Sequence, residues 1–311
     1  MERRDFFAGM LGVVGAQKMH AKEPAAGGGE VFIERAASGK PHKGKVLALI
    51  TAHLDDGPGM ACGTVAKLLN EGYTGYFIRT SNDEKDSYDL SLGETIAANE
   101  RDAAEFIKVC GLKQWFNLGY RNHRLDDMAA TEMRVRLIFL FRLLKVDTVV
   151  TFDPWGHYEE NPDHYTTARA VEAACWMAGG HLDMPEHFAA GLEPHAVRER
   201  YYFARGPQLV NRVVDIGPTL QKKIDCLRAC RTMVDHTIRD IIADHAERDL
   251  NLPPFPDNPA VAFAEFTKMA VEHKARSVGE KYGLHYAEAF HYIGRDWMVE
   301  QDVLRKQTSL L

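Results

Sequence analysis

The stretch KVLALITAHLDDGPGMACGTVAKLLNEGY, residues 45–73, decides the fold of this chain. It opens with an unbroken apolar run at residues 45–51, which is typical of a strand covered on both faces. A helix is expected over about residues 60–70, closed by the glutamate and glycine that follow. The stretch therefore predicts a buried strand that turns directly into a helix.

One imidazole and two carboxylates crowd together where this strand stops, at His53, Asp55 and Asp56. A helix N-cap explains one of the carboxylates, but it needs neither the second carboxylate nor the imidazole. Such groups repel and desolvate one another unless a positive charge lies among them. The pattern therefore indicates a cation site.

Strands alternate with helices along the rest of the chain. Further strands are expected at residues 73–81, 114–120, 146–152, 199–205 and 211–217. Further helices are expected at about residues 93–110, 131–145, 164–178, 219–248 and 259–282. This alternation implies right-handed crossovers and an α/β fold with a mostly parallel sheet flanked by helices, including extra helices towards the C-terminus.

A second polar segment, FDPWGHYEENPDHY at residues 152–165, follows the strand expected at 146–152. Sites in parallel sheets form outside the carboxyl ends of the strands, so this segment and the first can share one crevice. It supplies two imidazoles, His157 and His164, and the carboxylate of Asp163. Imidazole and carboxylate are zinc ligands, and a catalytic zinc needs about three of them and an open position.

The second segment also has structural explanations. Asn161 followed by proline fits an N-cap with Pro at the first helical position, and Asp163 fits the first turn. His164 is harder to explain in this way, because a cation in the first turn opposes the helix dipole. A neutral, metal-bound imidazole avoids that cost.

Composition places the chain among ordinary globular proteins. It has 311 residues, 45% hydrophobic and 26% charged, with a formal net charge of −6. No stripe rich in Lys and Arg appears, so nucleic acid is not an expected partner. The five cysteines lie in apolar helical contexts without a Cys-x-x-Cys pair, which predicts buried thiols, with a Cys226–Cys230 bridge as the alternative.

The N-terminus resembles an export signal. MERRDFFAGMLGVVGAQKMHA, residues 1–21, has paired arginines, a short apolar run and a small-residue exit, as in twin-arginine signals. The apolar run is too short to span a bilayer. We therefore expect an export signal and linker at residues 1–29, a single domain at 30–311, and a periplasmic or secreted protein that begins near residue 22. The alternative is a stray amphipathic helix on a cytoplasmic protein.

Two motifs carry a resemblance to a known family. AHLDD at residues 52–56 is similar to the Ala-His-Pro-Asp-Asp motif of the PIG-L/LmbE-like N-acetylglucosaminyl deacetylases. VVTFDPWGHYEENPDHY at residues 149–165 resembles that family's second motif, which usually ends in His-Pro-Asp-His. Weaker similarities extend the match over about residues 45–291. The resemblance implies a Rossmann-like α/β fold and a zinc-dependent hydrolase that acts on linear amide bonds.

The resemblance also implies roles for individual residues. His53, Asp56 and His164 occupy the positions of the family's zinc ligands, although another divalent ion such as Fe²⁺ could take the place of Zn²⁺. Asp55 occupies the position of the general base, and Asp163 that of a supporting residue. The implied substrate is a small N-acyl amino sugar or glycoconjugate.

The sequence departs from the family pattern at Asn161, where the family has a histidine that stabilises the oxyanion or protonates the leaving amine. Asparagine can donate a hydrogen bond but cannot deliver a proton at neutral pH. Either Asp55 passes its captured proton to the amine, or His157 or Glu160 takes that role. Leu54 and Asn122 also differ, and stand where the family has Pro and often Asp.

The substrate is only weakly constrained. Trp155 and Tyr158 flank the second motif and could stack on a sugar ring, or could simply pack in a loop. Arg121, like Arg79 and Arg124, could bind a carboxylate or phosphate, with a solvated loop charge as the alternative.

Other features of the sequence leave further readings open. Residues 181–200 hold three more imidazoles and could form a wall of the cleft. A dinucleotide-binding oxidoreductase is not expected, because no Gly-x-Gly-x-x-Gly follows the first strand. Two alternatives stay open: an amidase for a larger or non-sugar N-acyl group, and a metal-binding protein whose turnover is reduced or lost because of Asn161. The sequence leaves homo-oligomer formation open.

Overall fold

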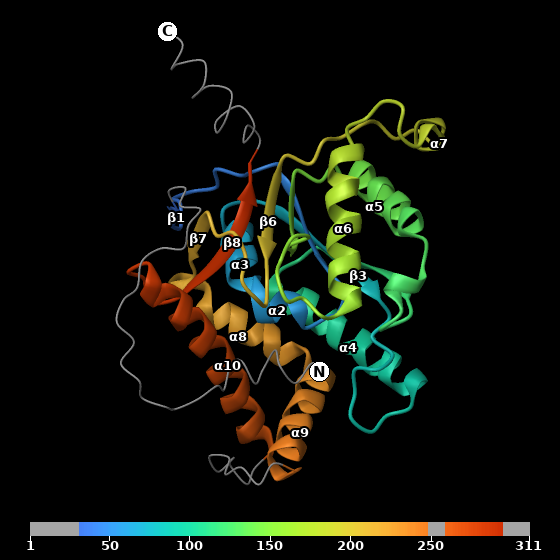
Figure 1. Ribbon diagram of the computed structural model, residues 1–311. Helices are drawn as coiled ribbons and strands as arrows, with labels where there is room; N and C mark the ends of the chain where they lie inside the picture. Colours follow the sequence, from blue (N-terminus) through green and yellow to red (C-terminus); the bar gives the residue numbers. More distant parts are fainter. Residues whose placement is uncertain (1–30, 248–258, 295–311) are drawn as a thin grey trace.

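Eight strands form one sheet in this computed structural model, which describes residues 31–247 and 259–294 (Figure 1). The spatial order of the strands is β1-β7-β8-β6-β5-β2-β3-β4. They are β1 (Phe32–Glu34), β2 (Val46–Thr51), β3 (Thr74–Ser81), β4 (Gln114–Tyr120), β5 (Thr148–Phe152), β6 (Glu199–Phe203), β7 (Arg212–Asp215) and β8 (Ala287–Ile293). The predicted α/β class is confirmed.

Most neighbouring strands are parallel, as the alternation of strands and helices predicted. β4, β3, β2, β5 and β6 form a continuous parallel block, and β1 pairs in parallel with β7. The sequence analysis did not predict β8, which runs antiparallel to both β6 and β7 and joins the two parts into a mixed sheet. It also did not predict the three-residue β1.

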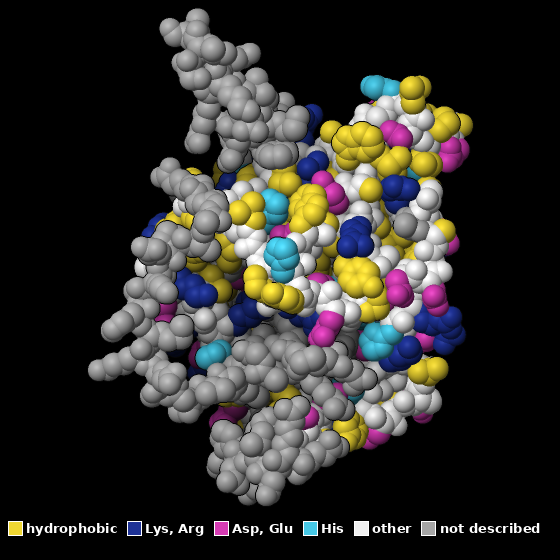
Figure 2. Space-filling model, viewed as in Figure 1, with side chains coloured by type: hydrophobic (Ala, Val, Ile, Leu, Met, Phe, Trp, Pro, Cys, Tyr) yellow, Lys and Arg dark blue, Asp and Glu magenta, His cyan; other side chains and the backbone are white. Residues whose placement is uncertain are grey.

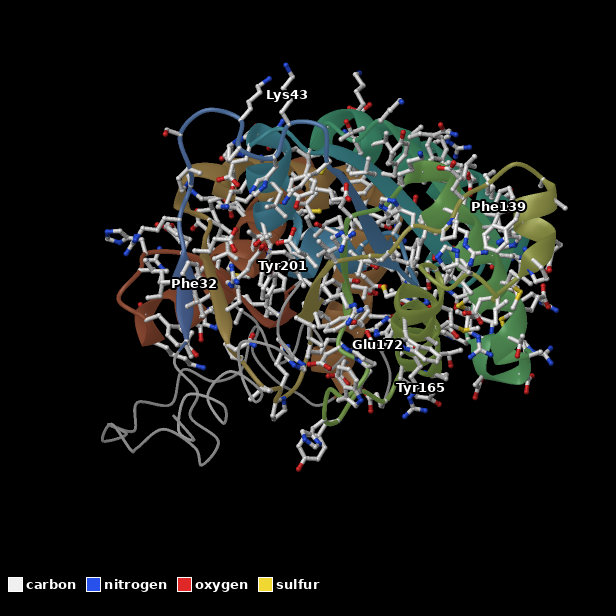
Figure 3. All side chains as sticks on the ribbon, turned by 90° about the horizontal axis from the view of Figure 1, so that it is seen from above. Phe32, Lys43, Phe139, Tyr165, Glu172 and Tyr201 are labelled. Atoms are coloured by element: carbon white, nitrogen blue, oxygen red, sulfur yellow. The ribbon has the colours of Figure 1, made fainter. Side chains whose placement is uncertain are left out.

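The helices cover both faces of the sheet. They are α2 (Asp56–Met60), α3 (Cys62–Asn70), α4 (Leu92–Cys110), α5 (Ala130–Leu144), α6 (Pro162–Met177), α7 (Pro185–Ala189), α8 (Leu220–Ala229), α9 (Arg231–Glu247) and α10 (Pro259–Lys281). Short 3-10 turns lie at Leu125–Asp127 and Gly217–Thr219. Seen from above, Phe32 in β1 and Phe139 in α5 lie at opposite ends of the molecule (Figure 3).

The alternation of side chains along β2 explains its unbroken apolar sequence. Leu47 and Leu49 pack into one core cluster with α3, α4, α8 and α10, whereas Ala48 and Ile50 pack into the other with α5 and α6. All four side chains are fully buried. Both faces of this strand are therefore covered, as expected for a central parallel strand.

Two helix predictions need correction. The helix expected at 60–70 begins earlier, at Asp56, and is divided into α2 and α3 by Ala61, whose backbone (φ −138°) leaves the helical region. The helix expected at 219–248 is likewise two helices, α8 and α9, separated at Cys230. The early start of α2 matters for function because Asp56 becomes its first residue.

Gly57 allows α2 to lie directly against the sheet. A Cβ atom at this position would come within 2.7 Å of a methyl carbon of Leu49, which is closer than real Cβ atoms approach. The glycine after Asp56 therefore sets how near this carboxylate lies to the end of β2.

The five cysteines are free and buried, so the prediction of buried thiols is confirmed and the Cys226–Cys230 bridge is not formed. No helix in residues 31–247 and 259–294 is long and apolar enough to cross a membrane. The predicted export signal and linker lie outside the described residues, and export stays a prediction.

Candidate metal centre

The two polar segments meet at the carboxyl ends of β2 and β5. These strands are neighbours, and the chain leaves β2 towards β3 on one side and reaches β5 on the other. Such a reversal of strand order leaves a crevice between the strand ends. His53 follows β2, and His164 lies in the first turn of α6, which follows β5.

Three ligand atoms converge in this crevice. Nδ1 of His53 lies 3.0 Å from Nε2 of His164. The Asp56 carboxylate lies 3.4 Å from the first of these nitrogens and 3.2 Å from the second. All three residues are buried. The structure thus brings together the three residues that the resemblance implied as ligands.

A carboxylate orients each imidazole. Nε2 of His53 lies 3.2 Å from Asp163, and Nδ1 of His164 lies 3.1 Å from Glu159. A carboxylate only accepts hydrogen bonds, so each of these ring nitrogens must be the donor. The lone pairs of the two other ring nitrogens therefore point towards each other and towards Asp56.

The orienting carboxylates are themselves held in place. Asp163 accepts backbone hydrogen bonds from His123 at 2.6 Å and Leu125 at 3.2 Å, both after β4. Glu159 is held by the guanidinium of Arg205. His164 also stacks on Phe152 with ring centroids 4.1 Å apart. Outer partners of this kind fix the ring orientation of metal-ligating histidines.

The electrostatics of the cluster favour a positive charge. Burial alone would lower the pKa of His53, but hydrogen bonds to Asp163 and Asp56 outweigh it and raise that pKa well above its ordinary value. Burial likewise opposes the charged form of Asp56, yet His164 and His53 hold the pKa of its carboxyl well below its usual range. The two carboxylates thus favour a positive charge beside His53.

The residues fit a divalent metal ion. Bonds of about 2.0–2.2 Å in a tetrahedral zinc site put neighbouring ligand atoms roughly 3.3–3.5 Å apart. The two imidazole nitrogens lie 3.0 Å apart, and the Asp56 carboxylate faces both of them, with Oδ1 3.2 Å from His164 and Oδ2 3.4 Å from His53, so the separations are close to that spacing. Two imidazoles and one carboxylate would leave one position of a tetrahedral ion open, as in catalytic sites.

Asp55 is buried beside this cluster but does not cap the helix. It stands at the N-cap position of α2, and its side chain makes no capping hydrogen bond. The carboxylate of Asp56 instead accepts a hydrogen bond from the backbone of His53 at 2.8 Å. Helix capping therefore does not account for this pair of aspartates.

Asn161 does cap a helix. Its side-chain oxygen accepts a hydrogen bond from the backbone of Asp163 at 3.0 Å, and Pro162 follows at the first position of α6. The structural explanation of this residue is confirmed. Since the cap uses only the oxygen, the amide nitrogen of Asn161 can still donate.

The other candidates lie further out. Trp155 and Tyr158 are exposed, by 54% and 87%, on the loop that leads into α6. His157 is exposed on the same loop and donates its backbone N–H to Pro207. Arg121 is exposed and pairs with Glu84 at 2.9 Å, and its role in substrate binding stays a prediction. None of these contacts joins these residues to the three clustered ligands.

Two expectations about the cleft are wrong. His187 contacts Arg142 at 3.1 Å, and His195 contacts Asp147 just before β5. These two imidazoles therefore lie towards the amino ends of the strands, away from the carboxyl ends where the candidate metal centre lies. Arg79 is fully buried and pairs with Asp83 and Glu100, and is not available as a loop charge.

The sequence analysis missed the carboxylates of the loop after β3. Asp83 accepts a hydrogen bond from the backbone of Leu54 at 3.3 Å, and burial raises its pKa to about 7. Asp86 accepts a hydrogen bond from Asn122 at 2.8 Å, so an aspartate at 122 would face a second carboxylate. The signal available in the sequence was that Asp83 and Asp86 directly follow the strand expected at residues 73–81.

Two further clusters could hold a metal by spacing alone. One joins His53 to Asp83 and Asp86, and the other consists of Cys62, Cys110 and Cys226 in the core. The first is weaker than the cluster described above, because Arg79, Ser81 and Asn122 already engage its carboxylates.

Three of the five non-glycine residues with positive φ in residues 31–247 and 259–294 lie in loops around the candidate metal centre. Asp83, His123 and Tyr158 adopt left-handed backbone conformations with φ between 52° and 61°, and lie in loops after β3, β4 and β5. Non-glycine residues in this region cost about 1–3 kcal/mol each and gather at functional sites.

Asp163→Asn should weaken metal binding about 10–100-fold, the usual effect of removing an outer partner. An asparagine keeps the shape of Asp163 but no longer offers His53 a charged acceptor. Competition with a chromogenic chelator measures the zinc dissociation constant. The unfolding midpoint of the metal-free variant should stay near that of the wild type, and equal zinc affinity in both proteins would contradict the positioning role.

Comparison with known proteins supports the importance of this region. The family model described as "PIG-L: GlcNAc-PI de-N-acetylase" matches residues 48–175, which include all three clustered ligands. A diacetylchitobiose deacetylase from Thermococcus kodakarensis is 26% identical over 197 residues, or 60% of this chain and 68% of the relative.

Solved structures share the fold. The N,N'-diacetylchitobiose deacetylase from Pyrococcus horikoshii has a TM-score of 0.66 at 22% identity, covering 82% of this chain and 85% of its own. The 4-carboxy-2-hydroxymuconate hydratase from Pseudomonas putida has a TM-score of 0.56 at 14% identity, covering 80% and 95%. One fold thus carries both a deacetylase and a hydratase, so the reaction must be argued from the site.

Proposed function

The chain belongs to the PIG-L/LmbE-like family of N-acetylglucosaminyl deacetylases, and on this premise we propose that it is a metal-dependent hydrolase. It removes an acetyl or other acyl group from an N-acylated amino sugar. The observation that carries the proposal is the convergence of His53, Asp56 and His164 at the switch point of the sheet.

His53, Asp56 and His164 would hold the ion, with Zn²⁺ as the expected metal. When bound, such an ion polarises an acyl carbonyl and lowers the pKa of a bound water towards about 7. His53 would offer the ion its Nδ1 and His164 its Nε2, because their other nitrogens donate to Asp163 and Glu159.

We assign Asp55 as the general base. It adjoins the ligand Asp56 in the chain, is buried, and does not cap α2. Its carboxylate takes a proton from the attacking water while the new carbon–oxygen bond forms. The role requires the Asp55 carboxylate to come within hydrogen-bond reach of the attacking water.

Asn161 takes part as a hydrogen-bond donor. Its oxygen is held by the cap of α6, which leaves its amide N–H groups for the acyl oxygen as negative charge develops there. Since Asn161 has no proton to transfer, Asp55 passes the captured proton to the nitrogen as the carbon–nitrogen bond breaks. The products are a carboxylate and an amine.

Asn161 also supports a second candidate, a metal-binding protein with reduced or lost turnover. The residue satisfies a structural demand of α6, so its presence does not by itself require catalysis. An amidase for a non-sugar N-acyl substrate differs from the main proposal only in the substrate.

An amine-release assay separates these candidates. Purified protein, stripped of metal and then reloaded with Zn²⁺, is incubated with N-acetylglucosamine, N,N'-diacetylchitobiose and an N-acetyl amino acid. We expect amine from an acetylated sugar only after reloading. Release from the amino acid alone would favour the amidase, and no release from a zinc-loaded protein would favour the metal-binding protein without turnover.

A further inference from the structure

Three thiols from three helices converge in the core and share no residue with the candidate metal centre. Cys62 begins α3, Cys110 ends α4, and Cys226 lies within α8. Their sulfur atoms all lie within 4.8 Å of one another. They meet because α8 packs against both α3 and α4 (Figure 1). This thiol cluster therefore joins segments that are far apart in the sequence.

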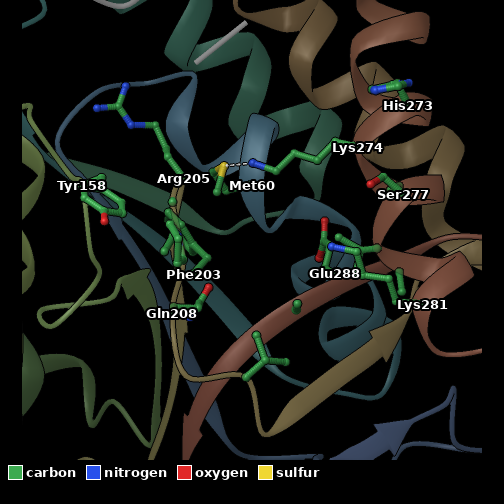
Figure 4. A pocket seen from close by; sticks show the side chains of 18 of the residues that line it. Met60, Tyr158, Phe203, Arg205, Gln208, His273, Lys274, Ser277, Lys281 and Glu288 are labelled. Atoms are coloured by element: carbon green, nitrogen blue, oxygen red, sulfur yellow. Dashed lines mark hydrogen bonds between the residues drawn. The ribbon is translucent and has the colours of Figure 1, made fainter. Parts of the chain in front are cut away.

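The thiol cluster is closed to solvent. Cys62 and Cys226 are fully buried, and Cys110 is 4% exposed. All three belong to the core cluster that packs against one face of the sheet. None of them lines the pocket of about 540 Å³ between α10 and the chain that follows β6, which Figure 4 shows. A ligand of this closed cluster is therefore a small ion bonded to the sulfurs rather than a molecule.

The spacing of the sulfurs suits a three-coordinate ion. Metal–sulfur bonds of about 2.3 Å place the three sulfurs of a trigonal site roughly 4.0 Å apart. Since the sulfurs lie within 4.8 Å of one another, no pair exceeds that spacing by more than about 0.8 Å. Small movements of the side chains are enough to bring the sulfurs onto one ion.

The donor set selects a soft ion that needs only three ligands. Thiolates favour Cu(I), Zn²⁺ and iron–sulfur clusters. Structural zinc is almost always four-coordinate, and iron–sulfur clusters are held by four cysteines. Among the His, Cys, Asp and Glu side chains of residues 31–247 and 259–294, no fourth joins this group, and burial keeps water away. Copper accepts trigonal coordination, so Cu(I) fits the cluster best.

Lys222 supplies a positive charge at the edge of the thiol cluster. Its ammonium donates to the carbonyl of Val109 at 2.9 Å, at the end of α4 that carries Cys110. Cu(I) bound by two thiolates and, more weakly, by the third thiol carries one negative charge, which this ammonium opposes. Two protons leave the thiols as the copper–sulfur bonds form. Copper stays Cu(I) throughout, so no oxidant or reductant is consumed.

We propose that Cys62, Cys110 and Cys226 bind one Cu(I) ion in the core. The ion ties α3, α4 and α8 together. The convergence of thiols from three helices carries this proposal, since two other buried cysteines, Cys175 and Cys230, do not join the group. The proposal does not rest on the proposed function, because the two sites have no ligand in common.

Competition for Cu(I) with bicinchoninate, a chromogenic chelator, tests the site in the absence of oxygen. The protein is first loaded with zinc, which fills the candidate metal centre. We expect the wild type to withdraw one equivalent of Cu(I), and Cys62→Ala and Cys226→Ala each to lower the affinity about 100-fold or more, the share of one ligand in a buried metal site. A wild type that leaves all of the Cu(I) with the chelator overturns the proposal.

Cys175→Ala is the matched control, because Cys175 is also buried but belongs to the other core cluster. It should bind Cu(I) as tightly as the wild type. Thermal unfolding of the copper-free proteins shows which variants are folded, and two separate ligand variants keep the test open if one of them is not. Equal loss of Cu(I) affinity in Cys175→Ala and in a folded ligand variant contradicts the assignment.

X-ray absorption at the copper edge identifies the atoms bonded to the ion. This matters because imidazoles, His157 among them, are exposed on the protein and offer nitrogen ligands to copper, and Figure 2 shows such side chains on one face. We expect only sulfur neighbours around copper in the wild type. Nitrogen or oxygen neighbours would place the copper elsewhere and overturn the proposal.

Zinc tests the preference for a three-coordinate ion. Titrated beyond the equivalent that fills the candidate metal centre, Zn²⁺ should not enter the thiol cluster, because it lacks a fourth ligand there. Absorption at the zinc edge should then show no sulfur neighbours. Zinc bound to sulfur in the wild type but not in Cys226→Ala would overturn the choice of Cu(I).

Discussion

Replacing His164 with alanine should remove bound zinc from the protein and abolish hydrolysis. The imidazole supplies one of three converging ligand atoms, with its Nε2 3.0 Å from His53 and 3.2 Å from Asp56. Apparent zinc-binding free energies of about 10–16 kcal/mol, shared among four ligands, correspond to roughly 10²–10³ or more in affinity per ligand. Metal content after dialysis against limiting zinc measures this loss.

His181→Ala is the control for this prediction. His181 is an exposed imidazole on the loop that follows α6, so its loss should leave zinc content and activity unchanged. Because His164 is buried against Phe152, the metal-free variant and the metal-free wild type should be compared by thermal unfolding. Wild-type zinc affinity in a folded His164→Ala protein would contradict its role as a ligand.

Asp55→Asn should lower kcat by about 10²–10⁴-fold, the usual contribution of a general base, while zinc stays bound. The substitution keeps the size of the side chain and removes only its capacity to take a proton. No helix cap is lost, because the Asp55 side chain makes no capping hydrogen bond. Steady-state kinetics and metal analysis on the same preparation measure both effects.

Asp56→Asn is the matched control for Asp55→Asn, because the two residues are adjacent and chemically identical. Asp56 faces both imidazoles, so its variant should lose zinc as well as turnover. If Asp55→Asn loses zinc to the same extent as Asp56→Asn, then Asp55 is a ligand and the division of roles is wrong.

Local patterns predicted most of the sheet, because each parallel strand is a short apolar run covered on both faces. β4 and β5 appear where their apolar residues indicated. β8 was missed because its sequence, AEAFHYI, mixes buried and half-buried positions and gains its place only by pairing with β6 and β7. The break at Cys230 was missed because α8 and α9 read as one continuous helical pattern.

The candidate site was predictable only in part, because several of its contacts join segments that are far apart in the sequence. His53 and His164 each follow a buried strand, and the family motifs mark both. Glu159 and Arg205 are 46 residues apart and Asp83 lies after a third strand, so their contacts depend on how loops meet in space. Residues 181–200 showed the reverse error, since two of their three imidazoles, His187 and His195, contact Arg142 and Asp147 and lie away from the candidate metal centre.

A crystal structure of the zinc-loaded protein, with anomalous data at the zinc edge, tests the central claim most directly. We predict one strong anomalous peak, bonded at about 2.0–2.2 Å to Nδ1 of His53, Nε2 of His164 and the Asp56 carboxylate. A peak at Cys62, Cys110 and Cys226, or at Asp83 and Asp86, with none beside His164, would contradict the account.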